Sequence, residues 1–246
     1  MNNKSLYSRP PVIEAVLALH FADPMQEKEI AALVRRLKRK FPWEEKLNQV
    51  TANFDMATGQ ASSTMASLGY KLDSQDRSQI VMIQPGFLGA IQRPPYTSWN
   101  ALYELAREQW EVLKKVRSYS RLSKISTRFI NRIDIPAPKD QTIDLTQYLV
   151  AGISLPEFAQ KKSLTNFYVN CALLDDDSKF INVLQLAAAP SPLIDHLSFT
   201  IDIDISSNSP VPMRDDELWN FINGLRERKN QLFESCITDQ TRALFQ

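Results

Sequence analysis

The stretch ISTRFINRIDIP, residues 125–136, is the segment from which both the fold and the candidate site are predicted. Its polar and apolar residues alternate, which is typical of a β-strand, and a proline closes it. Alternation places two sets of side chains on opposite faces of that strand: Arg128, Ile130, Arg132 and Asp134 on one, and Phe129, Asn131 and Ile133 on the other. This strand begins the second of two halves that have the same order of elements.

The first half reads as β-α-β-β-β-α. Residues 13–21 alternate like a strand, residues 27–41 carry apolar side chains at helical spacing, and Pro42 stops that helix. Alternating segments between residues 47 and 92 predict a group of strands. A helix of about five turns then starts near Ser98.

The second half, which joins the first near Ser120, repeats that order. After the strand at 125–136, residues 143–150 suggest a short helix, and residues 165–187 read as a hairpin. Residues 196–206 alternate again. A last helix runs from about 215 to 236, with acidic residues at its positive N-terminal end.

The repeated order predicts an α+β fold, with a curved, mainly antiparallel sheet and the helices on one face. This arrangement resembles TBP-like duplicated domains, built here from two β-α-β-β-β-α units. No low-complexity segment or flexible linker separates the halves. We therefore expect residues 1–246 to form a single compact domain with pseudo-repeat halves 10–119 and 120–246.

The composition excludes several kinds of site. The chain has 6 Gly, 2 His and 2 Cys in 246 residues, and its glycine content is about a third of average usage. It contains no glycine-rich dinucleotide turn and no phosphate-binding loop. Its histidines and cysteines offer no metal-ligand spacing. We expect no cofactor and no metal site from these residues.

Charge and hydropathy indicate a soluble, cytoplasmic protein without membrane association. The 29 Lys and Arg residues nearly balance 28 Asp and Glu, giving a net charge of +1, which disfavours a globally basic nucleic-acid binder. The N-terminal residues meet Glu14 before any long apolar run, so they do not read as a signal peptide. No stretch approaches the roughly 18 apolar residues of a membrane span.

The polar side chains that could form a site are concentrated in QRPPYTSWN, residues 92–100, and in the strand at 125–136. A ligand site for an anion or a partner would use six residues of these segments: Arg93, Tyr96, Trp99, Arg128, Asn131 and Arg132. Two arginines four positions apart on one strand could hold a phosphate or a carboxylate bidentately.

The alternative is that carboxylates on neighbouring strands neutralise these arginines. Glu14, Asp202 and Asp204 are the candidates for such structural ion pairs. Asp202 and Asp204 share one face of their strand. The sequence favours ion pairs over an open site and leaves both interpretations standing.

Other polar features have simpler explanations than a functional site. The basic run at 35–40 could contact nucleic-acid phosphates, but a solvated helix end is favoured. His20 lies among apolar strand residues. His196 is adjacent to Asp195, but neighbouring strand residues face opposite ways, so the two do not form an automatic dyad. Asp175 and Asp177 suit a turn. The spacing of Asp202 and Asp204 is compatible with Mg²⁺, the least favoured of these options.

Four motifs recur in an uncharacterised, sporadically distributed family of bacterial and archaeal proteins of about this length, which the chain resembles. They are a PP-hydrophobic-Glu start, a PY-x-x-W segment, an R-F-I-N-R-I strand and an F-x-x-x-I-T ending. The matching residues are Pro10, Pro11 and Glu14; Pro95, Tyr96 and Trp99; residues 128–133; and Phe233, Ile237 and Thr238. The family's usual ending also has a His one or two helical turns before that Phe, where this chain has Arg226 or its neighbours. The resemblance implies no activity or cofactor, and a patchy distribution is shared by mobile defence and toxin–antitoxin genes.

These observations favour a non-enzymatic binding protein, in a mobile defence or toxin-neutralising setting, that holds a protein partner or a small anion. Nucleic-acid binding through the sheet or the basic helix end is the first alternative. The second is a Mg²⁺-dependent enzyme acting on a phosphorylated small molecule, with Asp202 and Asp204 holding the metal. A homodimer is compatible with a sheet that has free edges.

Overall fold

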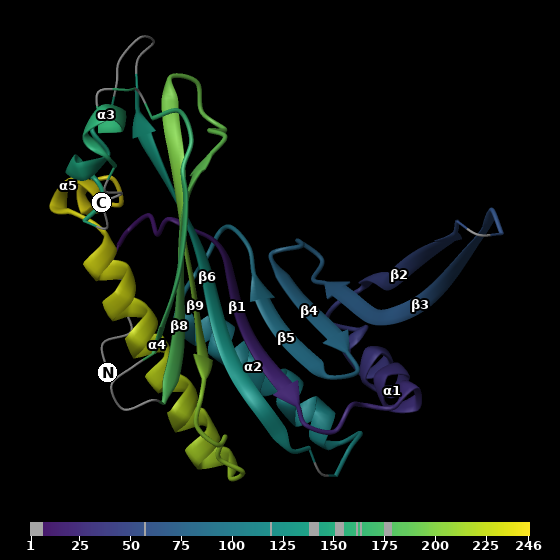
Figure 1. Cartoon of the computed structure of the whole chain (residues 1–246). Coiled ribbons are helices and arrows are strands. Elements are labelled where there is room, and N and C mark those ends of the chain that lie inside the picture. Colours follow the sequence, from purple (N-terminus) through teal and green to yellow (C-terminus); the bar gives the residue numbers. More distant parts are fainter. Residues whose placement is uncertain are drawn as a thin grey trace.

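The computed structural model describes most of the chain and places its strands in one curved, open sheet (Figure 1). The described residues are 7–56, 58–118, 120–137, 143–150, 155–160, 162, 164–174 and 179–246, with the backbone alone at 55 and 160. The predicted turn at Asp175 and Asp177 lies outside these residues.

The first half has one strand more than predicted. Its elements are β1 (Val12–Phe21), α1 (Glu27–Leu37), β2 (Trp43–Asp55), β3 (Gln60–Asp73), β4 (Gln79–Gln84), β5 (Phe87–Gln92) and α2 (Trp99–Lys114). The extra strand arises because the chain turns at Pro85 and Gly86, so the residues after β4 form the separate antiparallel strand β5. The small polar residues of QASSTMAS, with which β3 begins, hide the alternation of that strand. Helix α1 ends at Leu37, about one turn before the predicted end at residue 41.

The second half follows the predicted order with shorter helical pieces. Its elements are β6 (Leu122–Pro136), the 3-10 turn η1 (Leu145–Gln147), α3 (Glu157–Gln160), β7 (Tyr168–Leu174), β8 (Phe180–Ala189), β9 (His196–Ser207), α4 (Asp215–Cys236) and α5 (Asp239–Ala243). The predicted last helix corresponds to α4. Helix α5, which Thr238 caps by accepting from the Thr241 amide, was not predicted.

Strand order mirrors about the centre of the sheet. The nine strands of the described residues are antiparallel in the order β2-β3-β4-β5-β1-β6-β9-β8-β7. Outward from the central β1–β6 pair, β5, β4 and β3 on one side correspond to β9, β8 and β7 on the other. The boundary predicted near Ser120 falls between α2 and β6.

The three long helices cover one face of the sheet, and no long helix of the described residues covers the opposite face. Helix α2 packs on β1 and β5, α4 packs on β6 and β9, and α1 packs on α2 and the ends of β3 and β4 (Figure 1). One cluster of buried apolar residues runs through both halves beneath these helices. The predicted α+β class, with a curved antiparallel sheet, is confirmed. Within the described ranges, no helix has the length and apolar character needed to cross a membrane.

The β2–β3 ribbon extends well beyond its neighbour β4 (Figure 1). Strand β3 pairs with β4 only from Tyr70 to Asp73, but it pairs with β2 along nearly its whole length. A register shift beside Gly69 separates the two parts. Gly69 has φ +137°, and a Cβ there would lie 2.0 Å from the Ile83 carbonyl oxygen. Glycine is therefore required where the ribbon leaves the sheet.

We predict that Gly69→Ala lowers the free energy of unfolding by about 2–4 kcal/mol, because the methyl group clashes with backbone and the φ angle is strained. Gly86→Ala is the matched control, since a Cβ there meets nothing within 4 Å, and its cost should stay within about 0.5 kcal/mol. Urea unfolding of both variants measures the difference. Equal midpoints would contradict the close approach of β3 and β4 at this glycine.

Candidate functional site

Alternation along β6 divides the predicted ligand residues between the two faces of the sheet. Phe129 and Asn131 are buried toward the helices, with exposed fractions of 0% and 3%. Arg128 and Arg132 point to the opposite face, which we call the open face, and the Arg128 side chain is 47% exposed there. The six residues predicted as one ligand site therefore belong to two separate places.

On the open face, Arg128 forms a bidentate ion pair with Asp202. Its Nε donates to Oδ1 at 2.9 Å and its Nη2 donates to Oδ2 at 2.5 Å. The carboxylate belongs to β9 and is 8% exposed, and it raises the pKa of Arg128 by hydrogen bonding. Asp204 lies directly opposite Arg128 in the strand register. Burial raises the pKa of Asp204, and its Oδ1 has no hydrogen-bond partner.

The other two arginines of this face also have carboxylate partners. Arg132 Nε donates to Asp134 Oδ1 at 3.1 Å, and Arg93 Nε lies 3.5 Å from Glu14 Oε2. Each of the three arginines is thus neutralised by a carboxylate on its own strand or on another one. The open face presents ion pairs at these positions, as the alternative interpretation of the sequence describes for Glu14 and Asp202.

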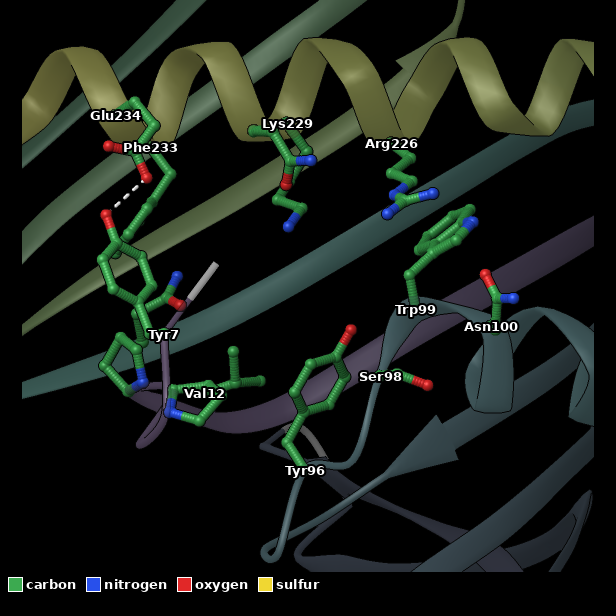
Figure 2. Close-up of a pocket in the computed structure, with 14 residues that line it drawn as sticks. Tyr7, Val12, Tyr96, Ser98, Trp99, Asn100, Arg226, Lys229, Phe233 and Glu234 are labelled. Carbon is green, nitrogen blue, oxygen red and sulfur yellow. Dashed lines mark hydrogen bonds between the residues drawn. The ribbon is translucent and has the colours of Figure 1, made fainter. Parts of the chain in front are cut away.

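On the helix-covered side, the remaining predicted residues line a cavity of about 270 Å³ (Figure 2). Tyr96, Trp99 and Asn131 form part of its wall. The other lining residues come from the chain before β1, from the start of β1 and α2, and from α4: Tyr7, Pro10, Pro11, Val12, Ser98, Asn100, Arg226, Lys229, Asn230, Phe233 and Glu234. We call this space the α4 cavity.

Aromatic packing fixes the sheet side of the α4 cavity. The rings of Tyr96 and Trp99 lie against Phe129, with centroid distances of 5.8 Å and 6.3 Å. Ser98 caps α2 by accepting a hydrogen bond from the Ala101 amide. Trp99 is therefore the first residue of a firmly started helix. Asn131 donates its side-chain amide to the Ile201 carbonyl at 3.0 Å, which holds it in the sheet.

Residues 7–11, which we call the strap, close another side of the cavity. The Tyr7 hydroxyl donates to Glu234 Oε1 at 2.6 Å (Figure 2). The Arg9 amide donates to the Phe245 carbonyl at 2.9 Å. Arg242 also donates to Glu234, through Nε at 2.9 Å. Glu234 is therefore engaged by two groups and is not ion-paired with a cation of the cavity.

Two cationic side chains of α4, those of Arg226 and Lys229, extend from the helix into this cavity (Figure 2). Lys229 Nζ lies 4.0 Å from the centroid of the Phe129 ring, and the Arg226 guanidinium carbon lies 6.0 Å from that of Trp99. Both are cation–π contacts. Among the described residues, no carboxylate lies within ion-pairing distance of either cation, in contrast to the arginines of the open face.

Enclosure in the α4 cavity changes the proton affinities of its groups. Burial lowers the pKa of Lys229 to about 7, and the nearby Arg226 lowers it further while Glu234 opposes the shift. Burial raises the pKa of Tyr96, with Arg226 acting in the opposite direction. At neutral pH the Tyr96 phenol therefore keeps its proton, and the Lys229 amine is close to its titration midpoint.

Sequence reasoning missed Arg226 and Lys229 as site residues, although a signal was present. Ile222, Arg226, Lys229 and Phe233 are spaced by four, three and four positions, which places them on one face of a helix. Ile222 and Phe233 belong to the apolar stripe. Two cations between them therefore point toward the core side, where an isolated charge requires a partner or a ligand.

The other predicted polar features lie away from this cavity. In the basic run, Lys38 pairs with Glu44 at 3.2 Å and Lys40 pairs with Glu108. His20 lies on the open face 3.4 Å from the Ser126 hydroxyl, and burial beside Lys124 lowers its pKa to about 4.

Two further findings concern His196 and the metal-ligand residue types. His196 donates Nδ1–H to the Ile194 carbonyl at 2.7 Å. Within the described part of the chain, no group of three or more His, Cys, Asp or Glu side chains could hold a metal ion.

A scan against protein-family models finds no match to this chain, and a search of curated proteins finds none either. The family resemblance therefore remains a prediction that rests on the four sequence motifs. Residues of these motifs nevertheless lie close together in the structure. One residue or more from each of the four lines the α4 cavity, and they are Pro10, Pro11, Tyr96, Trp99, Asn131 and Phe233.

The Arg128–Asp202 pair should contribute to stability. We predict that Asp202→Ala lowers the free energy of unfolding by about 1–3 kcal/mol, because it removes a charge-assisted hydrogen bond. A double-mutant cycle with Arg128→Met should give a coupling of about 1 kcal/mol, since the arginine is half-exposed. Additive effects of the two substitutions in urea unfolding would contradict the pair.

The lowered pKa of Lys229 predicts a pH dependence of stability. Its value is about 7 in the folded chain against 10.5 for the ordinary group, so the unfolded chain binds more protons between these values. The free energy of unfolding must rise with pH in that window, by at most about 1.4 kcal/mol per pH unit. Lys229→Met removes this contribution.

The measurement is the stability of wild type minus that of Lys229→Met, at pH 7 and at pH 9. Arg226, Tyr96, Tyr7 and Glu234 line the same cavity as Lys229, and all four are unchanged in the variant. Tyr7 and Tyr96 have raised pKa values and keep their protons across this range. The difference should be more favourable to wild type at pH 9, and a difference independent of pH would contradict an enclosed amine.

Proposed function

We propose that this protein is a non-enzymatic binding protein whose ligand is a small organic anion held in the α4 cavity. The observation that carries the proposal is the pair of partly buried cations, Arg226 and Lys229, that face the α4 cavity without an ion-pair partner among the described residues. Withdrawing a cation from water is costly unless an opposite charge accompanies it. An anionic ligand supplies that charge.

The apolar lining of the α4 cavity indicates the chemistry of the uncharged part of the ligand. Tyr96, Trp99 and Phe233, together with the two prolines of the strap, form apolar surface around the cations. Pockets of this kind hold the apolar body of a ligand and orient it through a few polar groups. The ligand we propose therefore combines one carboxylate or phosphate with a ring or a short hydrocarbon body.

The size of the cavity limits the ligand to a small molecule. About 270 Å³ lies just below the usual range for drug-sized ligands, which starts near 300 Å³. The open face supports this choice less well, because its arginines Arg93, Arg128 and Arg132 already have carboxylate partners.

Calorimetric titration with benzoate tests the proposal, with benzyl alcohol as the uncharged probe of similar shape. Benzoate should bind and benzyl alcohol should not, because only benzoate neutralises the two cations. Arg226→Met and Lys229→Met should each weaken benzoate binding by about tenfold or more, which corresponds to about 1.4 kcal/mol.

Arg228→Met is the matched control on the same helix. It removes an equal charge from a side chain that bonds Gln231 in an exposed position and does not line the cavity. Benzoate affinity should be unchanged in this variant. Equal binding of benzoate and benzyl alcohol, or equal losses in Arg226→Met and Arg228→Met, would overturn the proposal.

A further inference from the structure

Resting on the proposed anion site, we propose that Lys229 binds the carbonyl group of a 2-oxo carboxylic acid as an imine, while Arg226 holds its carboxylate. The α4 cavity would then capture its ligand covalently and reversibly. The ligand class follows from the placement of the two cations and from the surroundings of the amine.

The positions of Arg226 and Lys229 on α4 suit a ligand with two adjacent polar groups, as a 2-oxo acid has. The two residues are three positions apart on α4, so their side chains are neighbours on one helix face. In Figure 2 both descend from α4 into the same space. In a 2-oxo acid the carbonyl carbon is bonded directly to the carboxylate carbon. A carboxylate on the guanidinium therefore brings the carbonyl next to the amine.

The surroundings of Lys229 favour the neutral, nucleophilic amine. It lies over the Phe129 ring, beside a second cation, and makes no ion pair among the described residues. A lysine enclosed in apolar surroundings next to another cation is the standard way in which proteins activate an amine for attack on a carbonyl. Lys114 is its opposite, because Asp215 and Glu111 hold its ammonium group at 2.5 Å and 2.7 Å and raise its pKa.

The reaction is a balanced condensation that needs no oxidant or reductant. The amine nitrogen forms a bond to the carbonyl carbon as the carbon–oxygen π bond breaks, which gives a carbinolamine. The oxygen then leaves as one water molecule together with both hydrogens of the amine nitrogen, and a carbon–nitrogen double bond remains. Tyr96, whose raised pKa keeps its proton, lines the same space and can donate a hydrogen bond to the oxygen.

Reductive trapping tests the inference on the full chain. The protein is incubated at pH 7 with phenylpyruvate or pyruvate and sodium cyanoborohydride, which reduces an imine to a stable secondary amine. Peptide mass mapping should find the corresponding carboxyalkyl group on Lys229 and none on Lys114. Phenyllactate, which has a hydroxyl in place of the carbonyl, should slow the labelling by occupying the same cavity.

Phenyllactate binding to the wild type separates this inference from the proposed function. Lys229→Arg keeps a positive charge without a nucleophilic amine, so it should yield no trapped product. Phenyllactate binding to wild type without labelling of Lys229 would overturn the imine and leave the anion site standing. Labelling spread evenly over the lysines would also overturn it. Failure of phenyllactate and benzoate to bind would remove the anion site itself.

Discussion

The period-two geometry of β6 is the constraint on which the molecule depends. This strand pairs with β1 at the centre of the sheet and with β9 on its other side, so its register joins the two halves. Because successive side chains point to opposite faces, Phe129 and Asn131 must enter the helix side while Arg128 and Arg132 leave it. A shift of one residue would exchange these sets and place two arginines against the core.

The two faces of the sheet differ in whether their cationic side chains have carboxylate partners. On the open face, strands place carboxylates beside the arginines, and the charges cancel within the sheet. In the α4 cavity, Glu234 is the nearby carboxylate, but the Tyr7 hydroxyl and Arg242 both engage it. Arg226 and Lys229 therefore have no carboxylate partner among the described residues. This difference makes the cavity, rather than the arginine-rich face, the better candidate for the anion site that we propose.

Much of the fold follows from local patterns in the sequence, whereas the composition of the site depends on long-range geometry. Apolar spacing and acidic residues at its start predict α4 to within a residue. The start of β3 could not be found, because its small polar residues carry no alternation. Alternation at 128–132 already separated Arg128 from Asn131, yet grouping them by nearness in sequence joined them into one site. Tyr96 and Lys229 line one cavity because of the way α4 crosses the sheet, and no local pattern in the sequence predicts that crossing.

The contact between the strap and α4 joins residues that are far apart in the sequence, and this affects when the cavity forms during folding. Tyr7 and Glu234 are 227 positions apart in the chain, so the wall that they form is among the least local contacts of the protein. Contacts of such long separation form late, since the entropy of closing the intervening loop must be overcome first. The residues of α4 are also synthesised after those of β1 and α2. The α4 cavity is therefore complete only once α4 has reached the strap, which places its closure late in folding.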